Sequence, residues 1–216
     1  MTAQELAACT ELAWFAPEAT RADIQQLCAS ARAHSINAVC VNGSRVGLAY
    51  SLLEDSNVHV VALVGFPLGA ADADVLRYET ETAVDQGAHE IDFVLNAGRL
   101  KDGDHKQLLR ELCDIVEAAD ERDVKLVLES RLLTSDQILA AIGLASEAGV
   151  KFLVAGTGFN GATASVDDAR LLRENSGPEM GVKAAAGVGN IQLACALLEA
   201  GATRIGVIAG IKPPAG

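Results

Sequence analysis

The sequence lacks several features that would place a chain in a familiar class. No uninterrupted apolar run approaches the ~20 residues that a membrane-spanning helix needs. The first residues carry no basic stretch ahead of an apolar one, which argues against a signal peptide. The five cysteines are scattered without CxxC or CxxH spacing, and the histidines include no pair at metal-ligand spacing. We therefore predict a cytoplasmic protein with reduced thiols, no metal and no cofactor.

Positive charge and aromatic residues are also scarce. Lys and Arg number 17 against 29 Asp and Glu, which gives a net charge of −12 and argues against nucleic acid or an anionic membrane as a partner. Aromatic residues make up only 4% of the chain, so the core is expected to consist mainly of Ala, Val, Leu and Ile. The expected partner is a small molecule.

Apolar strand-like runs alternate with helical patterns along the whole chain. Eight strands are expected at 11–15, 36–42, 58–66, 89–96, 124–130, 150–156, 181–186 and 204–209. Seven helices are expected at 18–34, 44–54, 71–87, 103–122, 135–148, 165–176 and 190–201. This alternation predicts an α/β fold, a (β/α)₈ TIM barrel forming a single domain over residues 1–216. A doubly wound open sheet is the alternative, although no G-x-G-x-x-G follows the first strand.

The active site of such a barrel lies at the C-terminal ends of the strands. Asp92 in "EIDFVLN" and Lys183 in "GVKAAAG" place charges inside apolar strands, where burial is costly unless the charge is paired or functional. Strand parity points both side chains into the barrel. We interpret them as catalytic, and burial is expected to lower the pKa of Lys183.

Other residues at the strand ends are candidates for substrate contact. Cys40 and Asn42 share one face of the second strand, and Glu129 and Arg131 share one face of the fifth. The last two either contact substrate or pair with each other. Trp14 is placed at the barrel mouth as a candidate for stacking on a substrate, although core packing is the favoured interpretation. Loops 184–190 and 206–216, which contain Gly187 and Ile208, lie where barrels commonly bind phosphate.

Several stretches, in this order, resemble the deoxyribose-phosphate aldolase family. They include "AVCVNGSRVGLA" (38–49), "VGFPLGA" (64–70), "GAHEIDFVLNAGRLKDGD" (87–104), "KLVLESRLLT" (125–134) and "TGFNGATASVDDARLLRE" (157–174). The resemblance implies a class I aldolase barrel in which Asp92 shuttles protons and Lys183 is the second, pKa-lowering lysine. It places Cys40 and Glu11 beside the substrate, keeps the turn that begins at Thr157, and suggests a homodimer.

The chain departs from the family pattern at its most reactive position. The sixth strand of the family reads Phe-Val-Lys-Thr-Ser-Thr-Gly-Phe, and its lysine forms the Schiff base. Here residues 152–159 read Phe-Leu-Val-Ala-Gly-Thr-Gly-Phe, with Val154 in the place of that lysine. The two phosphate loops have lost hydroxyl groups and an arginine.

From these departures we expect altered chemistry on an unphosphorylated carbonyl substrate, as in specialised biosynthesis. Either Lys183 forms the imine, or Lys183 and Asp92 act as acid and base in a cyclisation, elimination or isomerisation. The alternatives are an inactive homologue that binds a ligand or a protein, and a true deoxyribose-phosphate aldolase.

Overall fold

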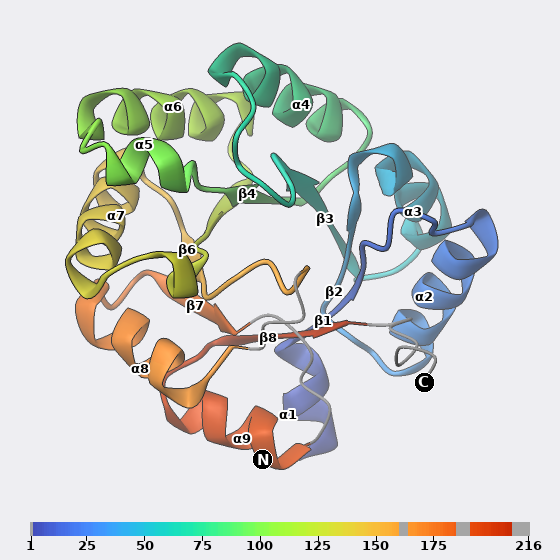
Figure 1. The fold of residues 1–216 in the computed structure, drawn as a ribbon. Coiled ribbons are helices and arrows are strands. Elements are labelled where there is room, and N and C mark those ends of the chain that lie inside the picture. Colours follow the sequence, from blue (N-terminus) through green and yellow to red (C-terminus); the bar gives the residue numbers. More distant parts are fainter. Residues whose placement is uncertain (1, 160–163, 185–190, 209–216) are drawn as a thin grey trace, which may run out of the picture.

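The computed structural model describes residues 2–159, 164–184 and 191–208, which form a closed barrel of eight parallel strands (Figure 1). Each strand pairs with the next in the chain, and β8 pairs with β1. This closure confirms the predicted TIM barrel and excludes the open sheet. The strands are β1 (Thr10–Trp14), β2 (Ala38–Asn42), β3 (His59–Val64), β4 (Glu90–Val94), β5 (Asp123–Val127), β6 (Phe152–Val154), β7 (Gly181–Ala184) and β8 (Arg204–Ile208).

Helices surround the barrel, and all seven expected ones are present, α7 with the expected bounds and the other six with shorter ones. They are α2 (Arg21–Ala33), α3 (Val46–Leu53), α4 (Ala73–Asp85), α6 (His105–Ala118), α7 (Ser135–Ala148), α8 (Val166–Asn175) and α9 (Ile191–Glu199). The short α5 (Ala97–Lys101) and the 3₁₀ helices η1 (Gly43–Arg45) and η2 (Ser130–Leu132) were not expected. In the described part of the chain, no helix is long and apolar enough to cross a membrane.

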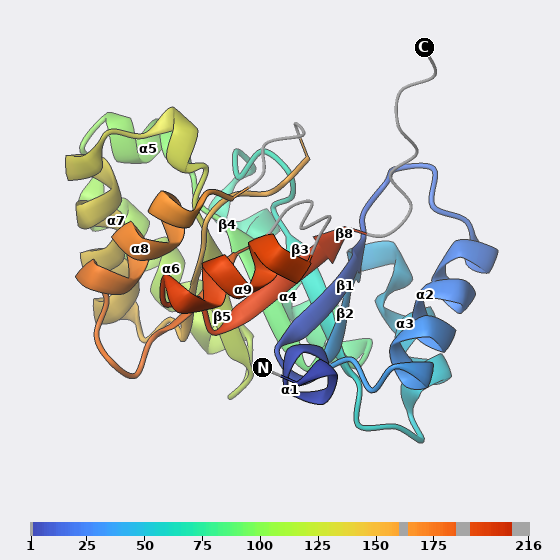
Figure 2. The same ribbon diagram turned by 90° about the horizontal axis from the view of Figure 1, so that it is seen from below.

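A further unexpected helix, α1 (Ala3–Ala8), lies at the end of the barrel where β1 begins (Figure 2). Its carbonyl at Ala7 accepts a hydrogen bond from the amide of Asn37, just ahead of β2. The carbonyl of Cys9 accepts one from the amide of Ile205 in β8. These bonds join α1 to the N-terminal ends of the strands, so the site loops lie at the opposite end.

The helix ends follow from local side-chain chemistry. Thr20 and Thr134 cap α2 and α7 through capping boxes with Asp23 and Gln137, as their sequence positions predict. Gly149 ends α7 with φ 84°, a left-handed conformation that favours glycine.

Two different interiors result from strand parity. On β4, Ile91 and Phe93 point outward and belong to the large apolar core between the barrel and the helices. Asp92 and Val94 point inward, as predicted. The inside of the barrel is only partly apolar, because it also encloses the buried side chains of Glu11, Glu90, Asp92, Lys125 and Lys183.

Candidate active site

A cavity opens at the C-terminal end of the barrel, where the predicted site residues gather. Seven of them line it: Glu11, Cys40, Asp92, Val154, Thr157, Lys183 and Ile208. The rest of its wall is largely apolar and comes from Ala13, Phe15, Leu63, Phe66, Val127, Gly156 and Gly206. The charged side chains of Glu11, Asp92 and Lys183 therefore form one polar cluster in an otherwise largely apolar wall.

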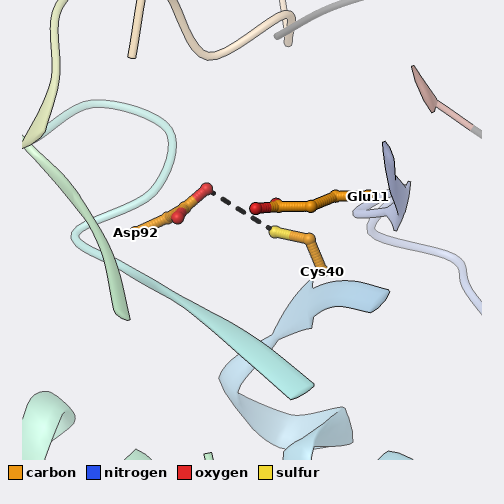
Figure 3. A group of neighbouring side chains, drawn as sticks. All are labelled: Glu11, Cys40 and Asp92. Atoms are coloured by element: carbon orange, nitrogen blue, oxygen red, sulfur yellow. Dashed lines mark hydrogen bonds between the residues drawn. The ribbon is translucent and has the colours of Figure 1, made fainter. Parts of the chain in front are cut away.

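The contact between Asp92 and Lys183 is the centre of this polar cluster. Lys183 Nζ donates to Asp92 Oδ2 at 2.6 Å and also to Glu11 Oε2. Figure 3 shows Glu11, Cys40 and Asp92 pointing toward one another from three strands. The Cys40 thiol donates to Asp92 Oδ2 at 3.8 Å. The two residues predicted to be catalytic are thus in direct contact.

A second lysine, which the sequence reading did not single out, lies beneath this pair. Lys125 is the register partner of Asp92 on the neighbouring strand β5, and its side chain is fully buried. Its Nζ lies 2.9 Å from Asp92 Oδ1, 3.3 Å from Glu11 Oε1 and 2.6 Å from Glu90 Oε2. The signal was available, because Lys125 also interrupts an apolar run of a strand.

Arg204 at the start of β8 completes the cluster. Its Nη1 lies 3.0 Å from Glu11 Oε1 and 3.6 Å from Glu90 Oε2. Three carboxylates therefore face three cations, so the buried network is neutral when every group is ionised. That balance matters because an unpaired charge in a barrel interior would be strongly destabilising.

The network holds its groups in their charged forms. Burial raises the pKa of Asp92, but attraction from Lys125 and Lys183 outweighs it, so the pKa of Asp92 lies below its usual range. Burial lowers the pKa of Lys183, but Asp92 and Glu11 outweigh it, so the net shift is upward. The expectation that burial leaves Lys183 with a lowered pKa is wrong, because two carboxylates contact its ammonium group.

Glu11, Cys40 and Asp92 also form the one group among the described residues whose donor atoms could converge on a metal, lying within 4.8 Å of one another. Burial raises the pKa of the Cys40 thiol, and the charge of Asp92 raises it further. The two carboxylates already bind lysine ammonium groups. A dication would have to displace these ammonium groups, so this donor set suits acid–base chemistry better than metal binding.

Four predicted residues lie away from the cavity wall. Trp14 is on the opposite face of β1, where it packs against the outer core beside α2. The structure therefore supports core packing, and the candidate place at the barrel mouth is wrong. Asn42 donates from Nδ2 to the carbonyl of Phe15 at 3.1 Å. Strand β5 ends at Val127, so the expectation that Glu129 and Arg131 share one face of this strand is wrong.

These last two residues also do not pair with each other among the described contacts. Glu129 Oε1 instead accepts a hydrogen bond from the amide of Thr157, which fixes the turn after β6. Arg131 lies in η2 and is exposed. Gly187 lies outside the described residues, as do most of the loops expected to bind phosphate.

Comparison with known proteins extends these observations. A model of the DeoC/LacD family aldolases matches residues 4–212. A deoxyribose-phosphate aldolase of Clostridium perfringens is 42% identical over 98% of this chain and 95% of its own length. One of Exiguobacterium sibiricum is 46% identical over 90% of this chain and 88% of its own length. The tetrameric deoxyribose phosphate aldolase of Aeropyrum pernix superposes with a TM-score of 0.89 at 25% identity, covering 95% of this chain and 88% of that one.

These relatives overturn the function expected from the sequence. Near-full-length identity to deoxyribose-phosphate aldolases contradicts altered chemistry on an unphosphorylated substrate, and with it the inactive-homologue alternative. The expectation gave too much weight to single positions, Val154 and the phosphate loops, against a pattern that runs through the whole chain. With its closed barrel, its buried Asp92–Lys183 pair and the match over residues 4–212, this chain belongs to the DeoC/LacD family of aldolases.

Proposed function

We propose that this chain is a deoxyribose-phosphate aldolase that cleaves 2-deoxyribose 5-phosphate reversibly through an imine on Lys183. The observation that carries the proposal is the Lys183–Asp92 pair, 2.6 Å apart on the wall of the cavity. Among the described residues, Lys183 alone brings an amine to that wall. The substrate is inferred from the name that relatives at 42% and 46% identity carry.

The reaction follows from the substrate's structure as a β-hydroxy aldehyde. The neutral amine of Lys183 adds to C1 and gives a carbinolamine. The hydroxyl group of the carbinolamine takes a proton from a general acid and leaves as water, so a protonated imine remains. A base takes the proton of the C3 hydroxyl, the C2–C3 bond breaks, and its electron pair moves into an enamine. C3 leaves as the aldehyde of glyceraldehyde 3-phosphate. Protonation at C2 and hydrolysis then release acetaldehyde and restore the amine.

Asp92 is the proposed proton carrier in these steps. Its Oδ2 already accepts a hydrogen bond from Lys183, so it can take the ammonium proton as the amine becomes nucleophilic. Glu11 contacts the same ammonium group and can share that proton. The protonated imine itself serves as the electron sink, so the reaction as proposed needs no cofactor.

Val154 stands where the family resemblance places the imine-forming lysine. Val154 is the register partner of Lys183 on the neighbouring strand, and both side chains line the cavity. The amine of Lys183 therefore opens onto the same space as the side chain at 154. We propose that the reaction and its intermediate stay those of the family and that β7 rather than β6 supplies the amine.

Trapping the imine tests this proposal. The purified protein should release acetaldehyde from 2-deoxyribose 5-phosphate, and borohydride in the presence of substrate should leave a reduced adduct that peptide mapping assigns to Lys183. Lys183→Met should abolish both signals. Lys151→Met, which removes an exposed lysine just before β6, is the matched control and should retain both. Failure to cleave the sugar phosphate would reject the function, and an adduct on another residue would reject the assignment to Lys183.

Recognition of the phosphate is tested with the matched substrate 2-deoxyribose. Hydrogen bonds to a charged group contribute about 1.5–3 kcal/mol, so kcat/KM should be roughly tenfold or more higher for the phosphorylated sugar. Equal kcat/KM for the two sugars would contradict phosphate recognition while leaving the aldol chemistry intact.

We also propose that the chain forms a homodimer. The support is that a relative, the protein from Aeropyrum pernix, self-associates, in its case as a tetramer. Sedimentation equilibrium of the purified chain should give twice the monomer mass of 22.4 kDa. A single species at the monomer mass over the accessible concentration range would contradict it.

A further inference from the structure

The buried network extends from the cavity to the opposite end of the barrel, and its outer part has no role in the proposed reaction. Asp92 Oδ1 contacts Lys125, and Lys125 lies 2.6 Å from Glu90 Oε2 at the start of β4. The other oxygen, Glu90 Oε1, lies 3.0 Å from His59 Nδ1 at the start of β3. A continuous chain of contacts therefore joins the half-exposed ring of His59 to the reactive amine.

We infer that Glu90 is a positioning residue, which holds Lys125 at the N-terminal end of the barrel and thereby sets how firmly Asp92 and Glu11 hold Lys183. Neither Glu90 nor His59 lines the cavity. The inference rests on the proposed function, because it gives the amine of Lys183 its chemical importance.

Competition between the two lysines is the physical basis of this inference. Lys125 and Lys183 share Asp92 and Glu11: Lys125 contacts Asp92 Oδ1 and Glu11 Oε1, while Lys183 contacts Asp92 Oδ2 and Glu11 Oε2. Glu90 gives Lys125 a third carboxylate, at the shortest of its three contacts. Without that carboxylate, Lys125 would draw more strongly on the two shared ones, and Lys183 would lose part of the attraction that keeps it protonated.

Groups around Glu90 keep its carboxylate in place and ionised. Arg204 Nη1 lies 3.6 Å from Glu90 Oε2, whereas His59 approaches the other oxygen, Oε1. The ring of His59 stacks on that of His89, with centroids 5.1 Å apart, and the Nδ1 atom of His89 accepts from the amide of Val60. Burial raises the pKa of Glu90, but Lys125 and Arg204 outweigh it and lower the pKa to about 2. Glu90 therefore acts as a fixed negative charge near neutral pH.

Chemical labelling of the lysines tests the inference without requiring turnover. Each protein is ethylated with acetaldehyde and cyanoborohydride at pH 7, and peptide mapping gives the rate at Lys183 relative to the exposed Lys151. Glu90→Gln should raise this ratio at least threefold, because only neutral amines react. Labelling of Lys125, which is fully buried and does not line the cavity, reports any general opening of the barrel and should stay low.

Asp123→Asn is the matched control. Asp123 is the register partner of Glu90 on β5, it is exposed, and it forms no ion pair among the described residues. This variant removes the same charge from the same end of the barrel, yet it should leave the labelling ratio unchanged. An equal rise of the ratio in Glu90→Gln and Asp123→Asn would overturn the inference. An unchanged ratio in Glu90→Gln would also overturn it, and so would the absence of any labelling of Lys183 in both the wild type and Glu90→Gln.

Variants of His59 keep the test decisive if Glu90→Gln does not fold. His59→Leu removes the group that holds Glu90 Oε1 in place, so the Glu90 carboxylate can move away from Lys125. The labelling ratio should therefore rise, but by less than in Glu90→Gln. His59→Gln retains a donor and should restore the wild-type ratio. A wild-type ratio in His59→Leu would then overturn the inference. Loss of sugar phosphate cleavage, by contrast, bears on the proposed function alone.

Discussion

Asp92 is the residue on which the two buried lysines converge. Each of its carboxylate oxygens contacts a different ammonium group, 2.9 Å from Lys125 and 2.6 Å from Lys183. Neutralising Asp92 would leave two cations in one barrel with a single shared carboxylate, Glu11. A single side chain thus balances charge in the resting protein and, in our proposal, moves protons during the reaction.

Asp92→Asn should therefore lower kcat for sugar phosphate cleavage by about 10²- to 10⁴-fold, the usual contribution of a positioned acid or base. The amide keeps the size of the side chain but cannot take a proton from Lys183. Asp102→Asn at the exposed end of α5 is the control and should retain wild-type kcat. Steady-state assays of both variants would decide, and a kcat for Asp92→Asn within threefold of wild type would contradict the role of Asp92.

The raised pKa of Lys183 predicts a steep pH dependence. Only the neutral amine forms an imine, and well below the pKa its fraction grows about tenfold per pH unit. The rate of cyanoborohydride-trapped ethylation at Lys183 should thus still climb by about tenfold per unit up to about pH 9. A plateau below about pH 8 would show that Asp92 and Glu11 do not hold the proton as tightly as the contacts indicate.

Strand parity was enough to predict that Asp92 and Lys183 face the cavity, but not to predict the full network. Lys125 and Glu90 meet the same criterion, since Lys125 interrupts an apolar strand and Glu90 shares the parity of Asp92. Both lie near the N-terminal ends of the expected strands 89–96 and 124–130, whereas the active site of a barrel is expected at the C-terminal ends. The direction in which the pKa of Lys183 shifts could not be predicted from the sequence. It depends on contacts with Asp92 and Glu11, which lie 91 and 172 positions earlier in the chain.

At the scale of elements, the order of strands and helices was predictable while their ends were not. The fifth strand was expected to continue to residue 130, yet β5 ends at Val127 and η2 begins at Ser130. The apolar letters of "VLES" cannot show that Glu129 turns to accept the amide of Thr157. This tertiary contact between the ends of β5 and β6 decides where the strand stops.

The pairing of β6 with β7 depends on one glycine. A Cβ at Gly181 would lie 2.1 Å from Cε1 of Phe152, and the Phe152 ring in turn supports the guanidinium of Arg204, 5.4 Å from its centroid. Gly181→Ala should lower the free energy of unfolding by about 1–3 kcal/mol, measured by urea denaturation. Gly177→Ala, where nothing lies within 4 Å of the added methyl group, should have a much smaller effect. Equal losses in both variants would contradict the packing argument.

At the scale of the whole molecule, the ion network links stability to acid. The folded pKa of Glu90, about 2, lies below its unfolded value near 4.5, so its contribution is present above pH 4.5 and is lost as the pH falls through 2. The shift corresponds to about 3 kcal/mol, of which more than half should be lost by pH 3. The difference in unfolding free energy between wild type and Glu90→Gln should therefore shrink from pH 7 to pH 3. A constant difference would contradict this.

The burial of that network also determines how it responds to salt. The side chains of Glu11, Asp92, Lys125 and Lys183 are at most 4% exposed, so dissolved ions weaken the contacts among them only slightly. Surface pairs such as Arg77–Glu117 are open to screening, which shortens the reach of a charge to about 3 Å at 1 M salt. The rate at which Lys183 reacts with a neutral aldehyde should thus be nearly the same in dilute buffer and in about 1 M salt.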